Sequence, residues 1–211
     1  MMNVKAPEAL DRLREGNRRF AAGVRSDDGL SRLVRRAAQV NGQDPFAVVL
    51  GCSDSRVPVE IVFDQGVGDL FVIRVAGNIV APSQIGSVEF AAERFGSRLV
   101  VVLGHSLCGA VQATVEAVQR PGSLGSRNLH SIVDRIRPTV EGLLAADPAK
   151  GAAALMQETV RAHVRVSADH LRHGSELLER LIEEDGLLVV GAEYSLESGV
   201  VDVFDGLPEK G

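Results

Sequence analysis

The sequence predicts an α/β fold: a parallel-rich central β-sheet with an antiparallel edge strand, flanked by helices and preceded by an N-terminal helical arm. From residue 46 onward, apolar runs of strand length alternate with helical patterns, an order typical of βαβ units with right-handed crossovers. Near the end, two more apolar runs lie close enough for a hairpin, which predicts the antiparallel edge strand. We expect one domain, with residues 1–42 as the arm and 43–211 as the α/β body.

The expected elements follow from the spacing of apolar residues. Helical spacing covers 7–22 and resumes over 30–40, which makes the arm. Strands are expected at 46–50, 70–75, 99–103, 187–190 and 200–204. Helices are expected at 59–63, 84–95, 108–118, 129–145 and 151–184. Pro138 should interrupt the fourth of these helices, and Gly174 weakens the fifth.

Composition excludes several classes of function. The net charge of −5 leaves no overall basic field that would attract nucleic acid or an anionic membrane. No apolar run approaches the ~20 residues that cross a bilayer. The first residues are charged and lack the apolar segment of a signal peptide, so we expect a cytoplasmic protein. Two cysteines in a reducing compartment are not expected to form a structural disulfide.

Soft metal ligands follow two of the predicted strands. Cys52 comes two residues after the run 46–50, and His105 and Cys108 come just after 99–103. Because ligands bind at the carboxyl ends of parallel strands, we expect all three to hold one zinc ion. Three protein ligands leave one tetrahedral position open, which is typical of a catalytic site. Water in that position has its pKa lowered to about 7, so zinc-bound hydroxide becomes available near neutrality.

Asp54 and Arg56 make a second pair next to Cys52. A carboxylate there can accept a hydrogen bond from the zinc-bound hydroxide and orient it for attack. Left free, the same carboxylate can become a fourth zinc ligand and close the site. A bidentate bond from Arg56 would keep Asp54 ionised and turned away, so we expect a catalytic pair.

The motifs CSDSRVP (52–58) and GHSLCGA (104–110) resemble those of the β-class carbonic anhydrases. The resemblance extends through EGNRRF (15–20), DLFVIRVAGN (69–78), IGSVEFAAERFG (85–96) and VVGAEYSLESG (189–199). It implies reversible hydration of carbon dioxide to bicarbonate and a proton. It also implies one zinc ion per subunit on Cys52, His105 and Cys108, and an Asp54–Arg56 dyad. Assembly as a homodimer or homotetramer, with active sites at the subunit interface, is implied as well.

The resemblance also implies substrate-binding residues. Gln43 matches a glutamine that donates a hydrogen bond to substrate, and Phe71 matches an aromatic residue of the carbon dioxide pocket. Phe90 stands where plant enzymes carry tyrosine, and Ala76 replaces a larger aliphatic residue, so the pocket should be roomier and drier. Gly109 lets the substrate approach the backbone closely.

Two alternative functions stay open at this point. A hydrolase of a carbon dioxide analogue, such as carbon disulfide, would use the same fold, because the shape of the access tunnel decides between the two substrates. A non-catalytic zinc or thiol redox protein would use Cys52 and Cys108 as oxidant sensors. Asp54, Arg56 and Gln43 would be idle in such a protein, which disfavours it.

Two further expectations concern residues outside the predicted zinc site. Some bacterial members carry an inhibitory bicarbonate site made of Trp, Arg and Tyr. Arg74 and Tyr194 match two of its residues, but Val49 holds the Trp position, so we expect this site to be weak or absent. The other four histidines lie in helical patterns: His130, His163, His170 and His173. His170 and His173 could share one helix face, and we expect them to be solvated.

Overall fold

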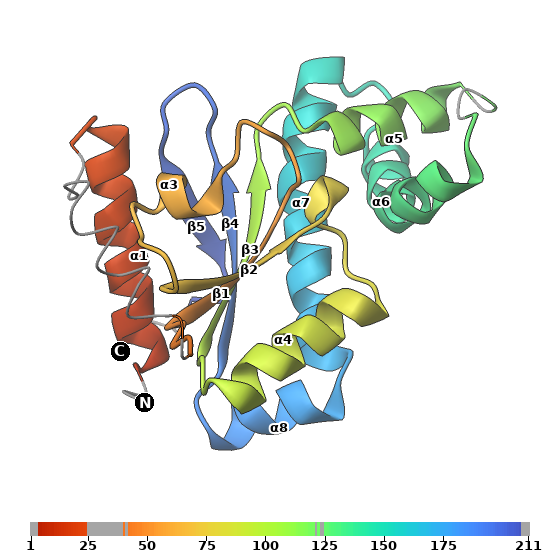
Figure 1. The fold of residues 1–211 in the computed structure, drawn as a ribbon. Coiled ribbons are helices and arrows are strands. Elements are labelled where there is room, and N and C mark those ends of the chain that lie inside the picture. Colours follow the sequence, from red (N-terminus) through yellow and green to blue (C-terminus); the bar gives the residue numbers. More distant parts are fainter. Residues whose placement is uncertain (1–3, 25–39, 41, 121, 123–124, 208–211) are drawn as a thin grey trace.

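A five-stranded sheet forms the centre of the protein (Figure 1). The structure is a computed structural model that describes residues 4–24, 40, 42–120, 122 and 125–207. The strands are β1 (Ala47–Gly51), β2 (Leu70–Arg74), β3 (Leu99–His105), β4 (Leu188–Tyr194) and β5 (Val201–Asp205). Their order across the sheet is β2-β1-β3-β4-β5. All neighbours pair in parallel except β4 and β5, which are antiparallel, so the predicted fold class is confirmed.

Helices cover both faces of this sheet. They are α1 (Ala6–Ala21), α3 (Val59–Val62), α4 (Pro82–Arg94), α5 (Gly109–Gln119), α6 (Arg127–Ala146), α7 (Ala152–His173) and α8 (Glu176–Glu184). A short 3₁₀ turn, η1 (Ala76–Asn78), follows β2. The helix expected at 30–40 lies, apart from Val40, outside the described residues. Within the described residues, no helix is long and apolar enough to cross a bilayer.

The two faces of the sheet have separate cores. On one face, α1 packs its apolar stripe, including Leu10 and Leu13, against Val49 and Val101. On the other face, α4, α7 and α8 cover Val48, Leu50 and their neighbours (Figure 1). The central strands β1 and β3 are buried along their whole length, which explains their near-continuous apolar runs. The first part of the expected arm is therefore a packed helix of this chain.

Two helical expectations have different outcomes. Gly174 does divide the long pattern, because α7 ends there and Ser175 caps α8 by accepting the amide of Leu178. The interruption expected at Pro138 is wrong, since α6 continues through it. Pro138 faces solvent, where water can satisfy the carbonyl that loses its helical partner. Burial of Ile136 and Val140 on the opposite side holds the helix together.

The register of the central strands brings two loops to one edge. Gly51, the last residue of β1, pairs with Leu103 of β3. The chain leaves β1 at Cys52 and leaves β3 at His105, so both residues emerge at the carboxyl edge of the parallel sheet. Helices α5 and α6 lie beyond this edge and contribute a third apolar cluster, which includes Cys52 and Cys108 (Figure 1).

Candidate metal centre

Cys52 is fixed by backbone amides on both sides of its sulfur. It follows β1 directly and is buried. Its Sγ accepts hydrogen bonds from the amide of Asp54 at 3.4 Å and from the amide of Gly77 at 3.3 Å. Donors aimed at the sulfur favour its thiolate form, which is the form that binds metal.

His105 and Cys108 are separated by a tight loop. His105 is the last residue of β3, and Cys108 is the N-cap of α5. Leu107 between them has a φ of 56°, a left-handed conformation unusual for a residue with a branched side chain, and this turns the chain sharply enough to bring Cys108 back. The backbone amides of Ala110 and Val111, in the first turn of α5, act to lower the pKa of the Cys108 thiol.

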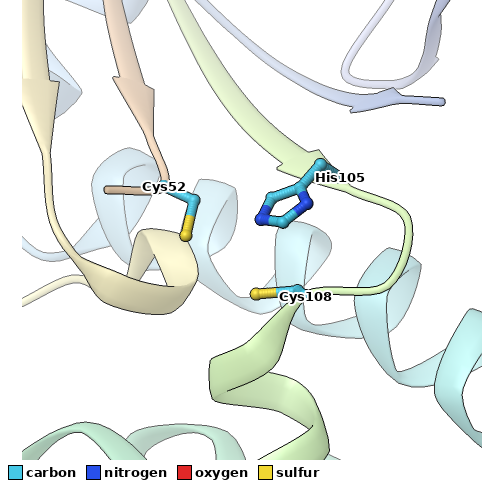
Figure 2. Close-up of side chains that lie close together, drawn as sticks. All are labelled: Cys52, His105 and Cys108. Carbon is cyan, nitrogen blue, oxygen red and sulfur yellow. The ribbon is translucent and has the colours of Figure 1, made fainter. Parts of the chain in front are cut away.

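These three side chains converge on one point (Figure 2). The two sulfurs and a ring nitrogen of His105 all lie within 4.8 Å of one another, and all three residues are buried. Zinc bonds of about 2.3 Å to sulfur and about 2.0 Å to nitrogen bring ligands to comparable separations. Among the described residues this is the one cluster of His, Cys, Asp or Glu side chains that could hold a metal ion.

The histidine ring supplies an independent test of whether a metal fits. His105 Nδ1 lies 3.0 Å from the carbonyl oxygen of Ser106, which can only accept, so Nδ1 carries the proton. Nε2 is then left with a lone pair, and this atom is buried with no hydrogen-bond partner among the described residues. A buried acceptor without a partner is costly, and a metal ion between the thiols would satisfy it. The residues therefore fit a metal ion.

The two thiols do not share their protons equally. The hydrogen bond from Cys108 is the largest influence on Cys52, and with the backbone amides of Gly77 and Asp54 it lowers the pKa of the Cys52 thiol against the opposing effect of burial. The pKa of Cys108 is raised, first by the same hydrogen bond and then by burial. The site therefore favours the thiolate at Cys52 and the thiol at Cys108, and a metal ion would displace the Cys108 proton.

Asp54 and Arg56 form the bidentate pair that the sequence predicts. Arg56 Nε donates to Asp54 Oδ1 at 3.0 Å, and its Nη2 donates to Oδ2 at 2.8 Å. The Arg56 amide also donates to Oδ1 at 2.9 Å. These bonds hold the pKa of Asp54 well below its usual range. Asp54 Oδ2 lies 3.9 Å from His105 Nε2, so the carboxylate borders the metal centre.

The predicted substrate residues divide into two groups. Ala76 lies in η1 next to Gly77, and Gly109 begins α5 with open space where a side chain would be, so both are near the metal centre. Gln43 precedes β1 whereas Cys52 follows it, which separates them by about 17 Å of strand. Phe71 pairs with Val48, three register positions before the end of the strand.

Phe71 instead belongs to an aromatic cluster on the α4 face of the sheet. Its ring centroid is 6.1 Å from that of Phe90 and 6.0 Å from that of Phe95. Phe90 is 53% exposed, although it is a large aromatic residue. Within one chain, the structure does not bring Gln43, Phe71 and Phe90 to the metal centre.

The outcomes for Arg74 and the four remaining histidines depend on tertiary packing. Arg74 donates to the carbonyls of Cys52 and Asp54, at 3.0 and 2.7 Å, and so braces the loop that carries Cys52. His170 and His173 are exposed as expected, whereas His163 is only 2% exposed. Sequence spacing gave no signal for the amide of Gly77, because its bond to Cys52 depends on folded backbone geometry.

Known proteins similar to this chain agree with the site. A family model described as "Carbonic anhydrase" matches residues 47–201. Carbonic anhydrase 2 of Mycobacterium tuberculosis is 37% identical over 204 residues, covering 94% of this chain and 93% of that protein. A carbonic anhydrase of Mycolicibacterium smegmatis is 36% identical, covering 100% of this chain and 99% of that protein.

Solved structures show the same fold. The β-carbonic anhydrase CafA of Aspergillus fumigatus superposes with a TM-score of 0.76 at 24% identity, covering 94% of this chain and 92% of that one. The β-carbonic anhydrase CcaA gives 0.75 at 24% identity, with 95% and 93% covered. Neither the analogue hydrolase nor the redox protein considered above is favoured by these matches. With its metal-binding trio at the carboxyl edge of a matching sheet, the chain belongs to the β-carbonic anhydrase family.

Proposed function

We propose that this protein catalyses the zinc-dependent, reversible hydration of carbon dioxide to bicarbonate and a proton. The observation that carries the proposal is the buried trio of Cys52, His105 and Cys108, bordered by the Asp54–Arg56 pair. The two curated relatives that match nearly the whole chain are named carbonic anhydrases. A purely structural metal site would not require an ionised carboxylate beside its ligands, whereas a catalytic site would.

Zinc is the metal that suits this donor set. Two thiolates and one imidazole are soft to intermediate ligands, and zinc accepts them in tetrahedral geometry. Three protein ligands leave one coordination position for water or substrate. A zinc ion held there would lower the pKa of water enough to supply a nucleophile near neutral pH.

The chain's own residues then orient the reaction. Asp54 accepts a hydrogen bond from the attacking oxygen, so that its lone pair points toward the carbon atom of carbon dioxide. Arg56 holds both carboxylate oxygens of Asp54 and keeps that group charged. Loss of the Arg56 bonds would free Asp54 to become a fourth metal ligand and close the site. Gly109 leaves open space where a side chain would be, and the small side chain of Ala76 lies next to Gly77, so this side of the site suits a small linear substrate.

The rest of the pocket comes from a second subunit in this proposal. Gln43, Phe71 and Phe90 lie away from the metal centre of their own chain, and exposed Phe90 stands beside the edge strand β2. A homodimer formed along this edge would let Gln43 donate to the substrate oxygen and the phenyl rings line the pocket of the neighbouring subunit. Two β-carbonic anhydrases of Sordaria macrospora with this fold are described as tetrameric, which supports self-association as a dimer or tetramer.

In this proposal the protein is cytoplasmic and consists of one catalytic domain. Both cysteines are free and buried, and both must stay reduced to bind the metal. The division into an arm, 1–42, and a body, 43–211, describes the order of the chain within that single domain.

Stopped-flow hydration of carbon dioxide with a pH indicator tests the function directly. We expect zinc-loaded protein to accelerate hydration, with a rate that rises with pH. Cys52→Ser and His105→Ala should each lose the bound zinc, as measured by atomic emission. Their hydration rates should fall at least about 100-fold. Ser106→Ala is the matched control, because the hydrogen bond that the structure gives its side chain is with the Leu196 amide.

A hydration rate that is unchanged after complete removal of zinc would contradict the proposal. Rapid hydrolysis of carbon disulfide without carbon dioxide hydration would support the analogue hydrolase in its place.

A further inference from the structure

His163 is a buried histidine that belongs to no part of the site described so far. It lies in the middle of α7 and is 2% exposed. Its Nε2 is 2.9 Å from the carbonyl oxygen of Gly77 and 3.5 Å from Ser167 Oγ. Histidines are rarely buried this deeply without a polar role.

The chemistry of the ring defines the direction of that bond. Burial lowers the pKa of His163 to about 4, so the ring is neutral near pH 7 and carries one N–H group. A carbonyl oxygen can only accept, which assigns the proton to Nε2. Nδ1 is then an acceptor, and it has no partner among the described residues. The single donor of His163 is therefore committed to Gly77.

Gly77 connects His163 to the metal centre. Its carbonyl accepts from His163, while its own amide donates to Cys52 Sγ at 3.3 Å. Its φ is +70°, and a Cβ there would lie 2.9 Å from both Ala110 Cβ and Ile136 Cδ1. Asn78 follows with a φ of 44°. Glycine adopts this conformation readily, whereas a left-handed residue with a side chain, such as Asn78, costs free energy and persists only when its surroundings hold it.

Helix α7 provides that support at several points. Besides His163, Ser167 Oγ donates to the carbonyl of Asn78 at 3.2 Å. The same helix packs on β3 at Gly104, where a Cβ would lie 2.5 Å from Val164. Gly104 immediately precedes the ligand His105. Helix α7 thus holds the backbone on both sides of the metal centre.

We propose that His163 is a positioning residue of the metal centre: its Nε2–H group holds the Gly77 carbonyl, and this keeps the Gly77 amide on the sulfur of Cys52. The inference rests on metal binding as proposed above. An N–H···S bond draws charge from the thiolate and fixes its direction toward the ion. Loss of such supporting bonds lowers metal affinity by about 10- to 100-fold in comparable sites.

Cobalt(II) in place of zinc tests this, because the cobalt–thiolate absorption reports directly on both sulfurs. We expect His163→Leu, which keeps the volume but has no donor, to shift this absorption and to weaken cobalt binding about 10-fold or more. His163→Gln can still donate to Gly77 and should restore most of both. Thr159→Val is the control, since Thr159 is buried one turn away and its hydroxyl has no partner within the described part of the chain. It should leave the spectrum unchanged.

A second measurement needs no variant. In ¹⁵N-labelled protein loaded with ¹¹³Cd, the Gly77 amide proton should couple to cadmium through the sulfur, and the His163 ring should be protonated on Nε2. Absence of either signal overturns the inference, as does a His163→Leu protein with wild-type cobalt spectrum and affinity. A wild-type protein with no cobalt–thiolate absorption would overturn the proposed function itself, and this inference with it.

Discussion

Asp54 is the residue whose charge is most tightly controlled beside the metal centre. Its two oxygens accept three hydrogen bonds from Arg56, and its pKa is held well below the usual range. The depressed pKa means that Asp54 stays ionised at every pH at which the protein would work. Its contribution to folding is complete above the unfolded pKa near 4 and is lost only as the pH falls through the lower folded value.

Asp54→Asn should impair turnover and leave the metal in place. The amide keeps the shape of the side chain but loses the charge that orients the attacking oxygen, so we expect the hydration rate to fall on the order of 100-fold. Zinc content should remain one per chain, because Asp54 is not among the three buried ligands.

Ser53→Ala is the matched control for this variant. Ser53 is exposed in the same loop, and its backbone amide bonds Val75. Its removal should change neither rate nor zinc content. Unchanged turnover in Asp54→Asn would show that the pair with Arg56 has no catalytic role.

His163 makes the free energy of unfolding depend on pH. Its pKa is lowered in the folded protein to about 4, from about 6.5. As the pH falls from 6.5 towards 4, the unfolded chain takes up a proton that the folded chain does not, so stability decreases; below pH 4 this loss is complete. Between pH 7 and pH 4.5, wild-type protein should lose about 2–3 kcal/mol more than His163→Gln.

Urea unfolding of both proteins at the two pH values measures this difference directly. Metal release in acid affects both proteins, and the comparison between them removes that common effect. Equal losses of stability in the two proteins would rule out a buried neutral His163.

At the scale of elements, the buried side chain of Asn17 connects α1 to the body of the protein by hydrogen bonds. Asn17 Nδ2 donates to the carbonyls of Val62 and Gly199, at 3.1 and 2.9 Å. Its Oδ1 accepts from the amide of Val201 at 2.8 Å. One amide thus joins α1, α3 and the β4–β5 hairpin. Gly16 beside it cannot carry a side chain, because a Cβ would lie 1.8 Å from the Phe63 oxygen.

Asn17→Ala should cost about 2–4 kcal/mol of unfolding free energy, since it leaves several buried or half-buried backbone groups without partners. Chemical denaturation monitored by circular dichroism measures this cost. Arg18→Ala, at an exposed ion pair on the same helix, should cost less than about 1 kcal/mol. Similar costs for the two variants would show that Asn17 does not join these elements.

At the scale of the whole molecule, β2 is an edge strand with no further strand paired to it in the part of the chain that the structure describes, and exposed Phe90 lies close to it. Large exposed aromatic residues beside an open strand edge are typical of a protein interface. Gln43 and Phe71 are too far from their own metal centre to serve it. In the proposed assembly, a second copy of the chain covers the open edge and Phe90. It also receives Gln43 and Phe71 at its own metal centre.

Phe90→Glu should therefore weaken self-association and reduce activity together, because it places a charge in the proposed interface. We expect analytical ultracentrifugation to show a shift towards monomer and the hydration rate to fall at least about 10-fold, with zinc still bound. Leu129→Glu is the control, since Leu129 is similarly exposed on α6, away from β2. An active wild-type monomer would contradict the interface.

Much of this protein could be predicted from local sequence. Apolar runs of five residues bounded by Gly51 and Gly104 predicted the strands, because a strand buried on both faces must be continuously apolar. Cys52, His105 and Cys108 stand just past those strands, so parallel pairing alone directs them to one edge of the sheet. Asp54 and Arg56 are two residues apart, close enough for their bidentate pair to form within one loop.

Only the tertiary structure decided the rest. The burial of His163, the amide of Gly77 on Cys52 and the continuity of α6 through Pro138 depend on which surfaces face solvent and which face another element. The separation of Gln43 and Phe71 from the metal centre follows from strand register. The spacing of residues in the sequence reflects the secondary structure that each segment can form by itself. Burial and long-range hydrogen bonds exist only once the segments are packed together.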